Sequence, residues 1–141
     1  MDIVEYSDAL YRDQVIELWK LVFGYPDRRN DPALVIDKKL AAEDALFFIA
    51  VAGGTVAGTV MAGYDGHRGW IYSLAVHPSM RNLEIGTALL HRAEDALRRK
   101  GCVKINLQIL ETNGGVRLFY EKNGYRVEPR ISMGKELPEN V

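Results

Sequence analysis

The 141-residue chain has little cysteine and no long apolar run. Cys102 is its only cysteine, so an intramolecular disulfide bond is excluded and a reducing compartment is favoured. No apolar segment is long enough to cross a bilayer, and the N-terminal segment Met1–Glu5 starts acidic instead of combining a basic start with an apolar stretch. We therefore expect a soluble, cytoplasmic protein.

Positive and negative side chains are nearly equal in number. The formal net charge is −1, and 26% of the residues are charged. This balance produces no global field that would recruit nucleic acid or an anionic membrane, so neither is expected as a partner. The hydrophobic content of 48% is ordinary for a globular protein, and the length suits a single domain over residues 1–141.

Several catalytic motifs are missing as well. No serine lies in a G-x-S-x-G sequence, and no G-x-x-x-x-G-K-[ST] loop is present. The three histidines are scattered and Cys102 has no partner at ligand spacing, so we expect no metal site. A Rossmann-like nucleotide protein is disfavoured because no glycine triplet follows the first strand.

The apolar pattern of the first half predicts strands and helices with clear ends. Asp31-Pro32 suits a helix start, because aspartate caps the helix and proline lacks an N–H that would have no partner there. Gly53-Gly54 suits a tight hairpin turn between two strands. The expected elements are strands at 2–6, 46–52 and 55–64, a helix from Ser7 or Asp8 to Gly24-Pro26, and a helix from Asp31-Pro32.

The central stretch predicts a strand, a loop and a helix. A strand is indicated by alternation, in which Trp70, Tyr72, Leu74 and Val76 occupy every second position. His77-Pro78 ends it, a polar turn at 79–84 follows, and Ile85–Lys100 forms an amphipathic helix. A strand at 103–109 then completes a βαβ unit, so its two strands should be parallel.

The last part of the chain predicts one helix and two strands. Asn113 caps the helix and Gly124 ends it, although Gly114 and Gly115 in the first turn each cost up to about 1 kcal/mol relative to alanine. Closing strands are expected at 125–127 and 131–137. The fold class is therefore α/β, with a mixed central sheet that is antiparallel in its N-terminal half, contains a parallel pair in the middle and is flanked by about four helices.

The turn before the central helix is a candidate anion site. The first N–H groups of a helix have no internal partner, and Arg81 adds a positive charge beside them. An ordinary strand–helix connection with a surface arginine explains the same residues equally well.

Two segments around this turn resemble the GNAT superfamily of N-acetyltransferases. Leu74-Ala-Val-His-Pro78 followed by Arg81-x-x-Glu-x-Gly86 is similar to the family's acetyl-CoA motif, Arg/Gln-x-x-Gly-x-Gly/Ala after a strand ending in Val-x-Pro. Asn113-x-x-Val-x-x-Phe-Tyr120-Glu-Lys-x-Gly-Tyr125 is similar to its second signature, a helix carrying a tyrosine. With Gly58-Thr-Val and Gly63-Tyr-Asp-Gly-His-Arg68, the chain looks closest to the small, single-domain bacterial YpeA-like branch.

The resemblance implies that two parallel strands splay apart and that acetyl-CoA lies in the gap between them. Backbone groups of Leu74 and Val76 would bind the pantetheine arm and the thioester oxygen. Glu84 departs from the family pattern, because the family usually has its first glycine there, and we expect its side chain to weaken CoA binding. The implied CoA-binding residues are Leu74, Ala75, Val76, Arg81, Asn82, Leu83, Glu84, Ile85, Gly86, Thr87, Asn113 and Phe119.

Tyr120 is the expected catalytic residue. A phenol within hydrogen-bond distance can protonate the thiolate that leaves when an amine attacks a thioester. A tyrosine packed in an amphipathic stripe beside Phe119 is the more common use of such a residue, and the match to the signature decides for catalysis. The general base stays open between Asp65, His67, Tyr72, Glu111 and a chain of water molecules.

The resulting hypothesis is an N-acetyltransferase that moves an acetyl group from acetyl-CoA to a primary amine of a small molecule or protein. The amine attacks directly in a ternary complex, since no activated nucleophile is visible. A catalytically weak acyl-CoA-binding or sensor domain with a degenerate pyrophosphate loop is the alternative. The acceptor should enter opposite the pantetheine, beside the loop Tyr25–Asn30, and the resemblance is compatible with a homodimer.

Overall fold

The structure of the chain is a computed structural model that describes residues 1–24 and 27–138. The side chains of Asn82 and Leu83 also lie outside the described part, as do Tyr25 and Pro26, which were expected in the loop after the first helix. Residues 1–108 form one compact unit and the chain from Ile109 onward forms a second, so each unit is described by itself.

The first unit contains a five-stranded sheet in the order β1-β2-β3-β4-β5. Neighbours from β1 to β4 are antiparallel, whereas β4 and β5 are parallel. This arrangement confirms the mixed sheet expected from the sequence. The strands are β1 (Asp2–Glu5), β2 (Phe47–Ala52), β3 (Thr55–Tyr64), β4 (Gly69–Val76) and β5 (Ile105–Asn106).

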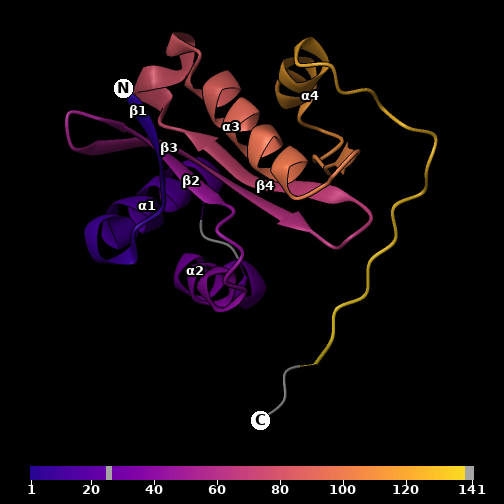
Figure 1. Ribbon diagram of the computed structural model, residues 1–141, viewed down its shortest axis with the longest axis horizontal. Coiled ribbons are helices and arrows are strands. Elements are labelled where there is room, and N and C mark those ends of the chain that lie inside the picture. The colour runs from indigo at the N-terminus through magenta and orange to yellow at the C-terminus, as the bar shows by residue number, and fades with distance from the viewer. Residues whose placement is uncertain (25–26, 139–141) are drawn as a thin grey trace. The chain divides into compact units, whose positions relative to one another are not determined.

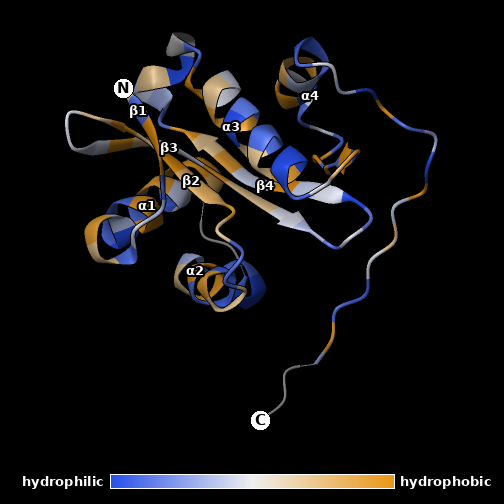
Figure 2. Ribbon diagram, in the orientation of Figure 1, coloured by the Kyte–Doolittle hydropathy of each residue, from blue (hydrophilic) through white to orange (hydrophobic). Residues whose placement is uncertain are grey.

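Helices cover both faces of this sheet. Helices α1 (Asp8–Phe23) and α2 (Pro32–Ala41) lie on one face and α3 (Ile85–Arg99) on the other (Figure 1). The strands between them are predominantly apolar, and α3 turns its polar side away from the sheet (Figure 2). Two short 3-10 helices, η1 (Arg28–Asn30) and η2 (Pro78–Leu83), precede α2 and α3. Among the described helices, none combines the length and apolar character needed to cross a bilayer.

Local sequence signals explain several element ends. The Asp31 carboxylate accepts a hydrogen bond from the Leu34 N–H at 3.2 Å, which confirms Asp31 as the cap of α2. Gly53 and Gly54 both have positive φ, as a tight hairpin turn requires. Ser7 occupies the N-cap position of α1 but makes no side-chain capping bond.

A bulge in β4 changes the faces that its side chains occupy. Met61 pairs with Tyr72, but Thr59 pairs with Ala75, so β4 contains one extra residue at Ser73, which has a φ of 49°. Trp70 and Tyr72 therefore lie on the α1 face, whereas Leu74 and Val76 lie on the α3 face. The expected uninterrupted alternation was wrong, although Leu74 and Val76 do share a face.

Buried polar contacts hold this bulge against α1. Trp19 Nε1 donates to Thr59 Oγ1 at 2.8 Å, and Thr59 Oγ1 donates to the Ser73 carbonyl at 2.8 Å. Thr59 has no exposed surface, so its hydroxyl needs both partners. These two hydrogen bonds connect α1 to β4, the strand that precedes the candidate anion site.

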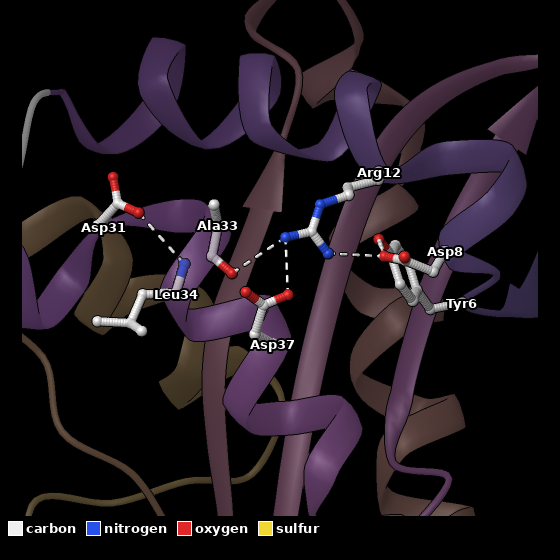
Figure 3. Close-up of polar contacts among 7 residues, drawn as sticks. All are labelled: Tyr6, Asp8, Arg12, Asp31, Ala33, Leu34 and Asp37. Atoms are coloured by element: carbon white, nitrogen blue, oxygen red, sulfur yellow. Dashed lines mark hydrogen bonds and ion pairs between the residues drawn. The ribbon is translucent and has the colours of Figure 1, made fainter.

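Arg12 connects both helices on that face to the end of β1. Its guanidinium binds Asp8 at 2.9 Å and Asp37 at 2.7 Å, and donates to the Ala33 carbonyl (Figure 3). The Tyr6 hydroxyl also donates to Asp8, at 2.8 Å. The hydrogen bond from Tyr6, followed by that from Arg12, lowers the pKa of Asp8.

We expect this cluster to make the fold sensitive to acid. A carboxyl with a lowered folded-state pKa contributes stability that is complete above its unfolded pKa, about 3.9, and is lost as pH falls through the folded pKa. Asp8→Asn should lower the thermal unfolding midpoint at pH 7, and its difference from wild type should shrink below about pH 4. Asp13→Asn, an exposed site on the same helix, is the control. A pH-independent difference for Asp8→Asn would contradict this account.

Three expectations about other segments were wrong. The strand expected at 103–109 is only Ile105–Asn106, and Val103 is almost fully exposed. The polar turn expected at 79–84 is largely the 3-10 helix η2. No strand forms at 125–127 or 131–137 in the described chain, where Ile131 and Met133 are exposed and alternation alone does not provide a pairing partner.

Candidate functional site

The parallel strands β4 and β5 pair only at their beginning. Gly69 pairs with Ile105 and Trp70 with Asn106, and in the described chain no strand neighbours β4 on that side from Ile71 to Val76. Gly69 permits the close approach, since a Cβ there would lie 2.7 Å from Cys102 Sγ. This pairing leaves one flank of β4 without a partner strand in the described chain.

The N-terminus of α3 lies where β4 ends. The Ala88 N–H bonds to the Glu84 carbonyl at 3.1 Å, and the Glu84 side chain makes no capping bond. The N–H groups of Ile85, Gly86 and Thr87 precede the first i→i−4 bond of the helix, where the helix dipole is positive. This end of α3 can therefore bind an anion.

Glu84 adopts the left-handed conformation, with φ 58° and ψ 22°. This region costs a residue with a Cβ roughly 1–2 kcal/mol but is open to glycine. The restriction on φ expected at this position is therefore real. The Glu84 side chain is exposed and makes no capping bond to the helix.

Arg81 and His77 organise the turn between β4 and α3. Arg81 Nε donates to the Val76 carbonyl at 3.3 Å, which places a guanidinium at the end of β4. The Ser79 N–H donates to His77 Nδ1 at 3.2 Å, so His77 caps η2. Asn82 and Leu83 contribute backbone to η2. Leu74 and Val76 are half-buried, and Ala75 is buried against the α1 side.

The second unit contains helix α4 (Gly114–Lys122). Asn113 Oδ1 accepts a hydrogen bond from the Val116 N–H at 3.3 Å, which confirms Asn113 as the N-cap. The helix begins at Gly114 despite the cost of the two glycines. The Tyr120 ring packs edge-on against Phe119 and Tyr125, with centroid distances of 5.2 and 5.5 Å. Burial raises the pKa of Tyr120 to about 12.

The sequence assigns these features to a family. A model described as the acetyltransferase (GNAT) family matches residues 12–125, which is most of the chain. The chain belongs to this family. The match includes β4, the turn with Arg81, helix α3 and Tyr120, so the residues expected to bind acetyl-CoA fall within the family's own domain.

Solved acetyltransferases share the fold of this GNAT chain. A glucosamine-6-phosphate N-acetyltransferase from Arabidopsis thaliana is 21% identical, with a TM-score of 0.73 over 97% of this chain and 98% of that one. An aminoglycoside antibiotic 6′-N-acetyltransferase from Acinetobacter haemolyticus is 17% identical, with a TM-score of 0.78 over 98% and 100%. A PaiA N-acetyltransferase from Thermoplasma acidophilum, in complex with coenzyme A, is 22% identical, with a TM-score of 0.73 over 92% of each chain.

The expected general bases of this GNAT protein differ in their electrostatics. Hydrogen bonds from the backbone N–H groups of Arg68 and His67 lower the pKa of Asp65, which makes it a weak base. Burial raises the pKa of Tyr72, and the charges of Asp44 and Asp65 raise it further, so its phenol stays protonated at neutral pH. His67 is exposed on the β3–β4 hairpin, and Glu111 is exposed in the second unit. In residues 1–24 and 27–138, no group of three His, Cys, Asp or Glu residues could hold a metal ion.

Sequence reasoning missed a group of residues beside Tyr72 in the GNAT domain. Lys39 Nζ binds the Asp44 carboxylate at 2.8 Å and donates to the Ala62 carbonyl, which joins the end of α2 to β3. Glu43 and Ala45 flank Asp44, and both have positive φ although neither is glycine. No sequence signal marks this left-handed pair, because Gly or Asn usually identifies such positions.

Proposed function

We propose that this GNAT protein transfers an acetyl group from acetyl-CoA to a primary amine by direct attack in a ternary complex. The observation that carries the proposal is the flank of β4 that has no partner strand in the described chain, beside an N-terminus of α3 that the Glu84 side chain does not cap. An extended pantetheine arm fits an unpaired strand, and a pyrophosphate fits a helix N-terminus. Both features lie in one compact unit and adjoin along the chain.

In this proposal the pyrophosphate and the pantetheine arm of acetyl-CoA are bound by different residues. The pyrophosphate is held by Arg81 and the backbone N–H groups of Asn82, Leu83, Glu84, Ile85, Gly86 and Thr87. The pantetheine arm and the thioester oxygen bind backbone groups of Leu74, Ala75 and Val76, with Asn113 and Phe119 on the pantetheine. A backbone N–H aimed at the developing oxyanion stabilises the tetrahedral intermediate.

The chemistry follows from these contacts. The amine lone pair attacks the thioester carbonyl, the carbon–sulfur bond breaks, and the departing thiolate takes the proton of the Tyr120 hydroxyl. The raised pKa of Tyr120 keeps that proton in place at neutral pH. This role requires the hydroxyl to lie within hydrogen-bond distance of the sulfur when acetyl-CoA is bound. The attacking amine loses its proton to His67, to Glu111 or to water, since Asp65 is a weak base and the Tyr72 phenol stays protonated at neutral pH.

The proposal is tested by binding and by turnover. Acetyl-CoA and CoA should raise the thermal unfolding midpoint, whereas ATP and NAD at the same concentration should not. Release of free CoA thiol should then depend on both acetyl-CoA and an added amine. Stabilisation by nucleotides alone, or thiol release that is independent of every amine, would reject the proposed function.

A sensor that binds acyl-CoA weakly is the second candidate, and the strained Glu84 favours it. Glu84→Gly should stabilise the fold by about 1 kcal/mol, because the left-handed cost removed exceeds the added freedom of the unfolded chain. It should also lower the CoA dissociation constant several-fold, since a carboxylate leaves the pyrophosphate loop. Chemical denaturation and calorimetric titration measure both effects. An unchanged dissociation constant would remove Glu84 as a reason for the sensor candidate.

Three finer assignments belong to the same proposal. The segments at Gly58-Thr-Val and Gly63–Arg68 support the bacterial YpeA-like branch of the family. The lone Cys102 supports a cytoplasmic location, because the chain forms no intramolecular disulfide. A homodimer is compatible with the family resemblance, and the balanced charge disfavours nucleic acid and membranes as partners.

A further inference from the structure

Thr59 lies at the centre of a buried hydrogen-bond relay between α1 and β4. Of the residues that the structure describes, it is the only buried one with an aliphatic hydroxyl, an amide or a charged side chain. Trp19 Nε1 donates to the Thr59 hydroxyl oxygen at 2.8 Å, and that hydroxyl donates its single proton to the Ser73 carbonyl at 2.8 Å. A valine would fill the same space, so shape alone does not account for the hydroxyl.

The Ser73 carbonyl is one end of a rigid peptide plane. In a trans peptide, the C=O of one residue and the N–H of the next point in opposite directions. The Thr59 hydroxyl therefore fixes the direction of the Leu74 N–H, which points away from Thr59. Ser73 has a φ of 49°, a conformation that a residue with a Cβ adopts only where its surroundings hold it. The bond from Thr59 supplies part of that support.

The bulge at Ser73 reverses the direction in which the following backbone groups point. The Gly69 N–H bonds to the carbonyl that precedes β5 at 2.9 Å. In a regular strand every second residue faces the same flank, so His77 would also face the β5 side. The His77 N–H instead bonds to a carbonyl of β3 at 2.8 Å. Leu74 and Val76 are therefore turned to the flank away from β3.

Arg81 independently supports this direction. Its Nε donates to the Val76 carbonyl at 3.3 Å, and Arg81 belongs to η2 and not to β3. In the described chain no strand neighbours β4 on this flank beyond Trp70. The groups that the bulge turns away from β3 are thus those of Leu74 and Val76, to which the proposed function assigns the pantetheine arm and the thioester oxygen.

Resting on the proposed function, we propose that Thr59 is a positioning residue for acetyl transfer and that Trp19 keeps its hydroxyl directed at Ser73. Thr59 acts through the Ser73–Leu74 peptide, which it holds with the Leu74 N–H turned to the flank where the thioester binds. A donor that is oriented before the reaction stabilises the developing oxyanion without reorganisation. A small displacement of such a group lowers the rate by a large factor.

The first test removes the hydroxyl and then restores it. Thr59→Val keeps the shape of the side chain and should lower kcat about 10-fold to 100-fold at saturating acetyl-CoA and amine. The dissociation constant for CoA should change little, because the proposed pyrophosphate contacts come from η2 and α3 and not from β3. Thr59→Ser keeps the hydroxyl and should have a kcat close to that of wild type.

A second variant tests the other end of the relay. Trp19→Phe removes the N–H donor and keeps a ring that can stack on Phe47. The Thr59 hydroxyl can still donate to Ser73, so kcat should fall less, about threefold to fivefold. Ile36→Ala is the control, since Ile36 is fully buried on α2 and the change lowers stability without touching the relay. Its kcat should equal that of wild type at a temperature where every variant is folded.

The Leu74 amide provides a readout that does not depend on turnover. In protein labelled with nitrogen-15 and free of ligand, the chemical shift of this amide should move in Thr59→Val. It should stay near the wild-type position in Thr59→Ser and in Ile36→Ala. A shift that Thr59→Val leaves unchanged would overturn the proposed role of Thr59.

The kinetic outcomes separate this role from the function on which it rests. A wild-type kcat in Thr59→Val, or a Thr59→Ser as slow as Thr59→Val, would overturn the positioning role and leave the transferase standing. An equal loss in Ile36→Ala would show a general effect of lowered stability and would also overturn it. If Thr59→Val does not fold, an unchanged kcat in Trp19→Phe overturns it. No amine-dependent turnover by wild type would reject the transferase and the positioning role together.

Discussion

Replacement of Tyr120 by phenylalanine is expected to lower kcat about 100-fold with little change in acetyl-CoA affinity. The substitution removes only the hydroxyl proposed to protonate the departing thiolate, and it preserves the ring that packs against Phe119 and Tyr125. Steady-state kinetics with saturating amine, together with direct titration of acetyl-CoA, separates the two quantities. Equal losses in kcat and in donor affinity would instead indicate a packing role.

The pH dependence of wild type provides an independent readout. Burial raises the pKa of Tyr120 to about 12, so its hydroxyl carries the proton at all pH values well below that. The rate should therefore show no loss from Tyr120 deprotonation between neutral and moderately alkaline pH. Tyr11→Phe, which removes a phenol hydroxyl from α1, is the control and should retain wild-type kcat. A rate for Tyr120→Phe within twofold of wild type would remove Tyr120 from the mechanism.

Substitution of Gly58 by alanine is expected to destabilise the fold by about 1–3 kcal/mol. A Cβ at Gly58 would lie 2.8 Å from the Ala75 carbonyl oxygen and 2.9 Å from Leu89 Cδ1. The first of these neighbours is backbone and cannot rotate away, so β3 has to move away from β4 and from α3. Ile85 Cγ2, at 3.3 Å, belongs to the first residue of α3, so the movement should also weaken CoA binding.

Gly115→Ala is the matched control for this change. A Cβ at Gly115 meets nothing within 4 Å, and alanine in the first turn of α4 should be neutral or stabilising by up to about 1 kcal/mol. Urea denaturation of both variants measures the difference. Equal stability of Gly58→Ala and wild type would show that β3 can shift away from β4 and α3 without cost at this point.

Much of the first unit could be predicted because its signals are local. Asp31-Pro32 contains its own cap and Gly53-Gly54 its own turn, so α2 and the β2–β3 hairpin form where the sequence indicates. The spacing of Ile85, Leu89, Ala93 and Leu97 likewise defines the buried face of α3. These elements depend on a few neighbouring residues and not on distant partners.

The remaining features depend on partners that periodicity does not reveal. The bulge at Ser73 is held by the Thr59 hydroxyl, which donates to the Ser73 carbonyl and accepts a hydrogen bond from Trp19, and an alternating sequence gives no sign of it. Strand β5 is short because β4 pairs with it only at Gly69 and Trp70. Residues 131–137 alternate as a strand would, but lie outside the sheet.

Sequence reasoning identified those residues of the candidate site that lie within a family motif. Arg81, Glu84 and Gly86 were found because their spacing resembles the acetyl-CoA motif, and the backbone constraint at Glu84 follows from the missing glycine. The group formed by Tyr72, Asp44 and Lys39 was not predicted as a unit, since these residues come from three elements that only the folded chain brings together. The placement of Tyr120 at the sulfur stays a prediction.

The proposed binding of acetyl-CoA along the unpaired flank of β4 would also change how long the protein survives in a cell. A strand whose free backbone groups bond to acetyl-CoA is more rigid when the acetyl-CoA concentration is high. A ligand at 100 times its Kd adds about 2.7 kcal/mol to the free energy of unfolding. Those amides between Ile71 and Val76 that do not bond to β3 should therefore exchange with solvent more slowly when acetyl-CoA is abundant than when it is scarce. Proteases would therefore degrade the protein faster when acetyl-CoA is scarce.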